Sequence, residues 1–172
     1  GDLACRRAQG AGSFGRLSEP RFACGKWRAS LKDMSVRVGL IQVGITDDEP
    51  VERRVPRVLE MTAGAAADHD LVVLPELWPI GAFAIDLMPS FGESLQGPLC
   101  TALAEVAATS ATWVFGGSFV ERFESPDGRV QFFNTQVVFA PDGSLAAAYR
   151  KVHLFGFNGG ETTVMSSGSD AV

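Results

Sequence analysis

The sequence has few cysteines and no long hydrophobic segment. Cys5, Cys24 and Cys100 are odd in number and widely spaced, which argues against a disulfide framework. No Cys-x-x-Cys or His-x-x-x-His pair occurs, so a zinc-binding module is not predicted. No apolar run approaches the roughly 18–20 residues that cross a bilayer. We therefore expect no metal and no membrane partner.

Basic residues are outnumbered by acidic ones. The chain has 15 Lys and Arg against 20 Asp and Glu, and this net charge of −5 argues against nucleic-acid binding by general charge attraction. A length of 172 residues with 46% hydrophobic and 20% charged residues is typical of one globular domain. Because no apolar stretch suited to a secretory signal is present, we expect a cytoplasmic protein.

The charge is unevenly distributed along the chain. Residues 1–34 hold seven basic and three acidic residues, whereas residues 35–172 hold eight basic and 17 acidic ones. The first segment is rich in Gly, Arg and Ser and shows no periodicity. We interpret it as a disordered basic leader or an upstream-translated segment. A transit peptide and a functional basic arm are the alternatives.

Residues 35–172 alternate between strand-like and helix-like patterns. Asp47 and Asp48 are candidate N-caps, and Pro50 suits a first helical turn. This order predicts an α/β fold with helices on one face of a mixed sheet. The chain stops in a Gly- and Ser-rich stretch, which suggests a fragment. Strands are expected at 36–43, 71–74, 113–120, 132–139 and 145–152, and helices at 51–67 and from Gly97-Pro98 onward.

Two charged residues are candidates for chemistry. Lys151 is the sole lysine after Met34, among basic residues that are otherwise all arginine. An ammonium group is a compact charge whose pKa responds to burial, a role that arginine cannot fill. Glu76 follows the buried strand at 71–74, and ligand sites of α/β sheets lie at such carboxyl ends. Apolar neighbours would desolvate it and raise its pKa, as suits a general base. The alternatives are chance for Lys151 and a solvent-exposed carboxylate for Glu76.

Four further polar residues carry weaker signals. Glu161 follows two glycines, and taken alone such a residue is expected to be exposed. His153 lies among apolar residues and suits a structural histidine. Cys100 lies in the first turn of a predicted helix, where the thiol pKa is lowered, but it borders an apolar stripe. Asn134 is expected to bond backbone groups rather than a substrate.

Two motifs together resemble a known family. The segment Leu-Val-Val-Leu-Pro-Glu at 71–76 is similar to the strand and glutamate of the nitrilase (carbon–nitrogen hydrolase) superfamily. The hairpin with Pro-Asp-Gly at 141–143, followed by Tyr-Arg-Lys-Val-His-Leu-Phe at 149–155, resembles that family's lysine motif. The likeness covers about residues 35–168. It implies an α-β-β-α sandwich of the nitrilase type, of which residues 35–172 would be the N-terminal part.

The resemblance also implies roles for residues. Glu76 would be the general base, Lys151 would stabilise the oxyanion, and Glu161 would help to orient the site. The family nucleophile is a cysteine on an elbow beyond the lysine, and no cysteine follows Lys151 here. The family resemblance therefore implies hydrolysis of small amides, less readily nitriles, while the printed chain is truncated before the nucleophile. The resemblance implies no cofactor, and it implies a homo-oligomer at full length.

Two other functions remain open at this point. One is an inactive α/β fragment or binding module, whose exposed sheet edges would favour pairing or aggregation. The other is a different thiol hydrolase that uses Cys100, which Cys100→Ala and iodoacetamide labelling would test. Trp78, Phe83 and Phe157 are candidates to line an acyl pocket, although such aromatic residues also suit a core.

Overall fold

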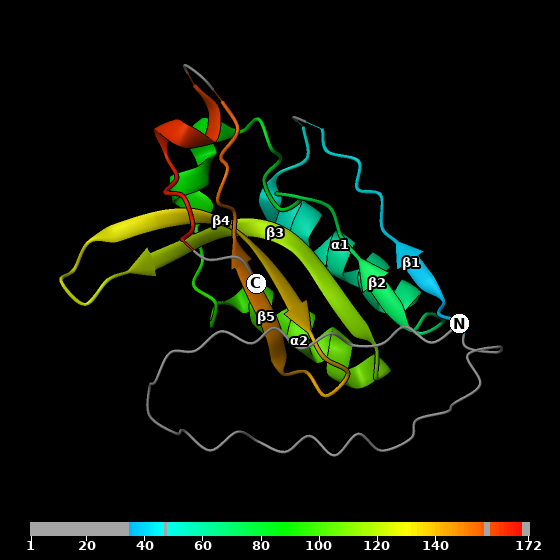
Figure 1. Ribbon diagram of the computed structural model, residues 1–172. Coiled ribbons are helices and arrows are strands. Elements are labelled where there is room, and N and C mark those ends of the chain that lie inside the picture. The colour runs from blue at the N-terminus through cyan, green and yellow to red at the C-terminus, as the bar shows by residue number, and fades with distance from the viewer. Residues whose placement is uncertain (1–34, 47, 157–158, 170–172) are drawn as a thin grey trace, which may run out of the picture. The chain divides into compact units, whose positions relative to one another are not determined.

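A computed structural model describes residues 35–46, 48–156 and 159–169. The predicted leader at 1–34 lies outside these residues. Within the described part, five strands form one sheet in the order β1-β2-β3-β4-β5, which Figure 1 shows from β1 in blue to β5 in orange. The first three strands are parallel, and β3, β4 and β5 are antiparallel. The strands are β1 (Val38–Leu40), β2 (Leu71–Val73), β3 (Trp113–Glu124), β4 (Val130–Phe139) and β5 (Leu145–Arg150).

The helices connect the parallel strands as predicted. Helix α1 (Val51–Ala66) lies between β1 and β2, and α2 (Pro98–Ser110) lies between β2 and β3. Two 3₁₀ segments, η2 (Ile85–Phe91) and η3 (Gly160–Thr163), follow β2 and β5. The sequence patterns predicted neither of them. The predicted mixed α/β architecture is therefore confirmed, with strand and helix bounds shifted by a few residues.

The start of α1 differs from the sequence prediction. The N-cap is Pro50 in an extended conformation, and no side chain bonds the free amides of the first turn. Asp48 therefore does not cap the helix, and Asp47 lies outside the described residues. Arg54, buried in the first turns, donates instead to the carbonyl oxygens of Thr46, Glu49 and Pro79. These bonds tie the start of α1 to the loop that follows β2.

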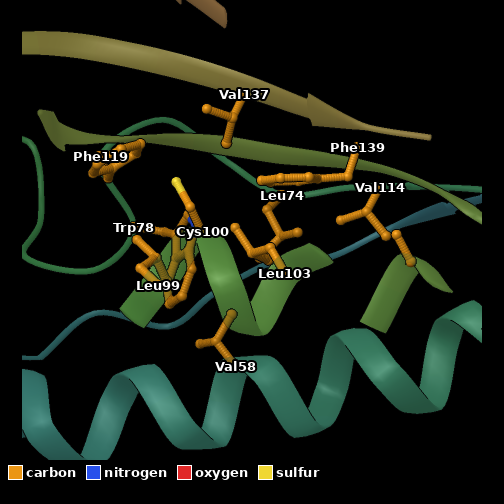
Figure 2. Packing of buried hydrophobic residues seen from close by; sticks show 11 residues of the cluster. Val58, Leu74, Trp78, Leu99, Cys100, Leu103, Val114, Phe119, Val137 and Phe139 are labelled. Carbon is orange, nitrogen blue, oxygen red and sulfur yellow. The ribbon is translucent and has the colours of Figure 1, made fainter. Parts of the chain in front are cut away.

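The core lies between the two helices and one face of the sheet. Figure 2 shows Val58 of α1, Leu103 of α2 and Val137 of β4 pointing into the same space. All three are fully buried. Because side chains alternate across a strand, every second residue of the sheet points into this core. Burial at ~25 cal/mol per Å² of apolar surface makes it the main source of stability.

The opposite face of the sheet carries an apolar stripe that remains partly exposed. In register across β1, β2 and β3, Leu40 is 77% exposed, Val38 45% and Trp113 42%. A contiguous apolar surface of this kind is unusual for an isolated monomer. We call it the open face, and it comprises Val38, Leu40, Leu71, Val73, Trp113, Phe115 and Val138.

A second, smaller cluster joins the two 3₁₀ segments. Met88 of η2 packs with Met165, which follows η3, and with Leu77, which follows β2. Figure 1 shows η3 in red beside the green segment that holds η2. The chain after β5 therefore returns to the segment after β2. Among the described residues, no helix has the length and apolar character needed to cross a membrane.

Candidate functional site

The backbone after β2 places Glu76 at the carboxyl end of that strand. A bulge interrupts the pairing of β3 with β4 between Phe115 and Ser118. At this bulge the amide of Ser118 donates to the carbonyl of Pro75 at 3.2 Å, and the Ser118 hydroxyl accepts from the amide of Leu77 at 3.0 Å. Leu77 has a φ of 47°, a left-handed conformation that is strained for leucine. Both neighbours of Glu76 are thus bound to β3, which fixes where its side chain begins.

Lys151 approaches Glu76 from the end of β5. Its amide donates to the carbonyl of Asn134 at 2.8 Å, which continues the β4–β5 ladder by one residue. Its Nζ lies 2.8 Å from Oε1 of Glu76 and 2.9 Å from Oε2 of Glu161. The structure therefore brings together all three residues that the sequence and the family resemblance selected.

Glu161 lies in η3 and is buried, with 3% of its side chain exposed. The expectation for an isolated Glu in a Gly-rich loop, exposure to solvent, is thus wrong. Its carboxylate accepts hydrogen bonds from the Phe155 amide at 2.7 Å, from the Asn134 side chain at 2.5 Å and from Lys151. These donors compensate for its removal from water.

Asn134 is a site residue that the sequence analysis assigned elsewhere. Its side-chain amide donates to Glu76 at 2.8 Å and to Glu161, so it bonds two carboxylates rather than backbone. It is 2% exposed in the middle of β4. The available signal was an amide inside an otherwise apolar strand, because such a group needs buried partners. We call Glu76, Asn134, Lys151 and Glu161 the carboxylate–lysine cluster.

Hydrogen bonds and neighbouring charges decide the ionisation of Glu161 and Lys151. Burial alone would raise the pKa of Glu161, but hydrogen bonds from Phe155, Lys151 and Asn134 outweigh it and hold that pKa below its usual value. Burial alone would lower the pKa of Lys151, but the carboxylates of Glu76 and Glu161 raise it above its usual value. Glu161 is therefore ionised and Lys151 protonated at neutral pH.

Glu76 differs from its sequence expectation in one respect. Its side chain is 55% exposed, so the predicted desolvation by apolar neighbours is absent. The carboxylate instead lies between solvent and the two donors Asn134 and Lys151, both of which reach its Oε1. No described residue bonds its other oxygen, Oε2, which can therefore accept a hydrogen bond from a molecule that enters the site.

Two hollows open beside the cluster. The larger of the two, of about 310 Å³, is lined by Gly117, Gln136 and Tyr149 with Glu76, Asn134 and Lys151. The smaller, of about 190 Å³, is lined by Phe83 and Phe155 with Glu76, Lys151 and Glu161. The Phe83 and Phe155 rings meet edge to face with centroids 6.5 Å apart. A small molecule in either hollow would contact both Glu76 and Lys151.

Other sequence candidates do not belong to the cluster. Trp78 is fully buried, and its Nε1 donates to the Gly116 carbonyl at 3.0 Å, so it is a core residue. His153 is exposed and is not the buried structural histidine that was expected. Phe83 lines one of the two hollows and stays a candidate for contact with an acyl group, whereas Phe157 lies outside the described residues.

Cys100 is not placed to act as a nucleophile. It is 3% exposed within the core between α2 and the sheet, as Figure 2 shows. Burial, together with the nearby carboxylates of Glu93 and Glu121, raises its thiol pKa to about 12. The lowering expected at a helix N-terminus is thus outweighed by burial, which argues against the Cys100 thiol-hydrolase hypothesis.

Within residues 35–46, 48–156 and 159–169, no cluster of three or more His, Cys, Asp or Glu side chains is suited to hold a metal ion. The chemistry available at the cluster is that of a carboxylate that can accept a proton and an ammonium group beside it. The pair suits proton transfer and the stabilisation of a developing oxyanion.

Comparison with known proteins identifies relatives over most of the described chain. The sequence model of the carbon-nitrogen hydrolase family matches residues 37–170. A 2-oxoglutaramate amidase from Paenarthrobacter nicotinovorans is 37% identical over 133 residues, which are 77% of this chain and 45% of that protein. The omega-amidase NIT2 of Homo sapiens is 34% identical over 125 residues, or 70% of this chain and 41% of that protein.

Solved structures share the fold. Nit3 of Saccharomyces cerevisiae, a member of the nitrilase superfamily, has a TM-score of 0.61 at 25% identity, covering 80% of this chain and 50% of that one. An amidase from Nesterenkonia sp. has a TM-score of 0.60 at 19% identity and covers 78% and 49%, respectively. The chain thus spans about half the length of these structures and less than half of the two amidases above.

Proposed function

The chain belongs to the carbon–nitrogen hydrolase family, and from that premise we propose that it supplies the glutamate–lysine part of an enzyme that hydrolyses small non-peptide amides. One observation carries the proposal. Lys151 Nζ lies within 2.9 Å of carboxylate oxygens of both Glu76 and Glu161, beside two hollows. A substrate carbonyl in either hollow would lie close to the ammonium group and to the exposed carboxylate.

We assign the proton-transfer role to Glu76. It would accept the proton of a cysteine thiol, and the thiolate would attack the amide carbon to form a C–S bond. The carbonyl electrons would move onto oxygen, and Lys151 would stabilise the resulting oxyanion. Glu76 would then give its proton to the departing nitrogen, so that the C–N bond breaks and ammonia leaves.

The second half of the reaction would use the same carboxylate. Glu76 would take a proton from water, whose oxygen attacks the thioester carbon, and would return that proton to the sulfur as the C–S bond breaks, which releases the carboxylic acid and the thiol. Glu161 and Asn134 would keep Lys151 and Glu76 in place throughout. The cysteine is proposed to come from sequence not included in the printed 172 residues, because none follows Lys151.

Amides are favoured over nitriles as substrates. The relatives at 37% and 34% identity are named 2-oxoglutaramate amidase and omega-amidase, which supports a terminal amide of a small carboxylic acid. The Phe83–Phe155 pair would contact the aliphatic part of such a molecule. Lys151 is the one cation among the described residues that line the two hollows. A substrate carboxylate would thus need a further partner.

The test begins with the intact mass of the native protein and the coding frame beyond Val172. Ammonia release is then measured with 2-oxoglutaramate, butyramide and the corresponding nitrile, butyronitrile. We expect activity on the amides, and at least a hundredfold loss of kcat in Glu76→Gln and Lys151→Met, of the order found for single proton-transfer or oxyanion groups. Glu105→Gln, an exposed carboxylate on α2, is the matched control and should retain activity.

Two results would overturn the proposal. One is a native mass near 18.3 kDa with no hydrolysis of any amide, which would favour the inactive module instead. The other is full activity of Glu76→Gln in a longer native protein. Faster turnover of the nitrile than of both amides would reverse the substrate preference.

A further inference from the structure

In two pairs of adjacent residues, one side chain points to each face of the sheet. Asn134 and Thr135 are neighbours on β4, and Arg150 and Lys151 are neighbours at the end of β5. Because successive side chains of a strand alternate, Asn134 and Lys151 point to the carboxylate–lysine cluster while Thr135 and Arg150 point to the helix-covered face. Thr135 and Arg150 are register partners across the two strands.

Behind the carboxylate–lysine cluster, Glu121 of β3 binds both of these helix-side residues. Glu121 is buried, with 2% of the residue exposed, and its carboxylate accepts a hydrogen bond from Thr135 Oγ1 at 2.7 Å. Arg150 donates to both oxygens, from Nε at 2.8 Å and from Nη2 at 2.5 Å. We call Glu121, Thr135 and Arg150 the Glu121 cluster.

The guanidinium of Arg150 is also held by two aromatic rings. Its central carbon lies 4.1 Å from the ring centroid of Phe133 and 4.5 Å from that of Phe123. Stacking on aromatic faces and two-point binding of a carboxylate both depend on the planar shape of guanidinium. Arg150 therefore has one well-defined position.

We propose that the Glu121 cluster fixes the end of β5 and thereby holds Lys151 between Glu76 and Glu161. Glu121 and Arg150 are positioning residues, since they act on the opposite face of the sheet. The inference concerns the placement of Lys151. Only the claim that this placement serves catalysis rests on the proposed function.

The position of β5 explains why its end needs a side-chain tether to β3. This strand is six residues long, lies at the edge of the described sheet and ends at Arg150. Edge strands fray readily because they have one hydrogen-bonded neighbour. The Arg150 side chain reaches across β4 to Glu121 of β3, which adds a bond that does not depend on the backbone ladder. Because Lys151 is the next residue, fixing Arg150 also fixes the backbone from which the Lys151 side chain begins.

The test measures how fast the Lys151 amine is acylated. The chain has three lysines, Lys26, Lys32 and Lys151, so mass spectrometry of peptides resolves each after trace labelling with acetic anhydride. Only a neutral amine reacts, and two carboxylates keep Lys151 charged. The quantity compared is the labelling rate of Lys151 in folded protein, divided by its rate in urea.

Arg150→Met gives opposite predictions for positioning and for simple charge removal. If Arg150 positions Lys151, its loss frees the amine from the carboxylates and speeds acylation, by about tenfold for each unit by which the Lys151 pKa falls. If Arg150 acts only as a nearby cation, its removal raises the pKa of Lys151 and slows acylation. Faster labelling supports the proposal, and unchanged or slower labelling overturns it.

A matched control removes a different arginine from the same sheet. Arg122 of β3 pairs with the exposed Glu124 at 3.4 Å, away from Lys151. Because exposed pairs of this kind contribute little, Arg122→Met should change Lys151 labelling by less than about twofold. A change equal to that of Arg150→Met would overturn the proposal.

A milder variant and amide exchange separate local release from unfolding. Thr135→Val removes one hydrogen bond to Glu121 but leaves Arg150 in place, so we expect a smaller increase in labelling. In both variants, exchange of the Lys151 amide should accelerate while that of Leu103, in the core of α2, stays unchanged. Equal acceleration at both amides would assign the Glu121 cluster to global stability and overturn the proposal. None of these measurements requires turnover, so they are independent of the amidase assay.

Discussion

Gly117 on β3 lies against the carbonyl oxygen of Pro75, so closely that a Cβ at position 117 would overlap this oxygen. Gly117 also has a φ of +64°, within the left-handed region that favours glycine. Since Pro75 precedes Glu76, this contact limits how near Glu76 can approach the bulge of β3. A residue without a side chain therefore helps to set the geometry of the site.

Substitution of Gly117 tests this contact against a control. Gly128 has a φ of +81° in a turn, and a Cβ added there would meet no atom within 4 Å. Gly128→Ala should cost about 1–2 kcal/mol from backbone strain alone. Gly117→Ala should cost clearly more, because the backbone of Pro75 must also move. Urea unfolding of both variants measures the difference, and equal losses of stability would exclude a special role for the contact.

Acid should weaken the carboxylate–lysine cluster through Glu161. Its pKa in the folded state lies below the unfolded value of 4.5, so its stabilising effect is complete above pH 4.5 and is lost as the pH falls through the folded pKa. Glu161→Gln should cost about 1.5–3 kcal/mol at pH 7, the range for hydrogen bonds to charged groups. Unfolding in urea at pH 7 and pH 3 should show that difference shrinking in acid.

The control for this experiment is Glu105→Gln on the exposed side of α2, which should show no such pH dependence. A Glu161→Gln difference that stayed constant between the two pH values would contradict the assigned ionisation.

Cys100 should resist alkylation while the protein is folded. Its pKa of about 12, against 9.0 for an ordinary thiol, lowers the thiolate fraction at pH 8 by about a thousandfold. Iodoacetamide labelling, resolved by peptide mass spectrometry, should therefore be slow in buffer and rapid in urea. Fast labelling of Cys100 in folded protein would return it to the list of candidate nucleophiles.

The open face should make the 172-residue chain self-associate. Leu40 and Trp113 are large apolar side chains that lie on it and remain exposed. Leu40→Lys adds a charge to this surface and should lower the association constant by at least tenfold. Sedimentation velocity over a range of concentrations measures it. Glu60→Gln, on the exposed side of α1, makes the same one-unit change in net charge, and an equal effect of both variants would remove the open face from the explanation.

The sequence predicted those parts of the fold that depend on local pattern. Alternation of short apolar runs with helical spacing predicted the order of strands and helices, because each element buries one face. Glu76 and Lys151 could also be selected from local signals. Glu76 directly follows a buried strand, and Lys151 is the sole lysine after Met34. The family resemblance placed Glu161 beside them.

Long-range contacts explain what the sequence did not predict. Glu161 is buried because η3 folds back onto β4 and the Phe155 amide, a return that no local pattern in a Gly-rich segment encodes. Asn134 acquires its partners from residues 58 and 27 positions away. For Cys100 the local helix effect was considered, but burial between two layers exceeds it.

The adjacency of Arg150 and Lys151 has a consequence for folding accuracy. A slip of one residue in the pairing of β4 with β5 would exchange their faces and place the guanidinium between the carboxylates of Glu76 and Glu161. Both residues are cations, so charge alone would tolerate this error. The faces of Phe123 and Phe133, together with the two-point carboxylate of Glu121, suit a planar guanidinium better than a compact ammonium, and they thereby favour the correct register over the shifted one.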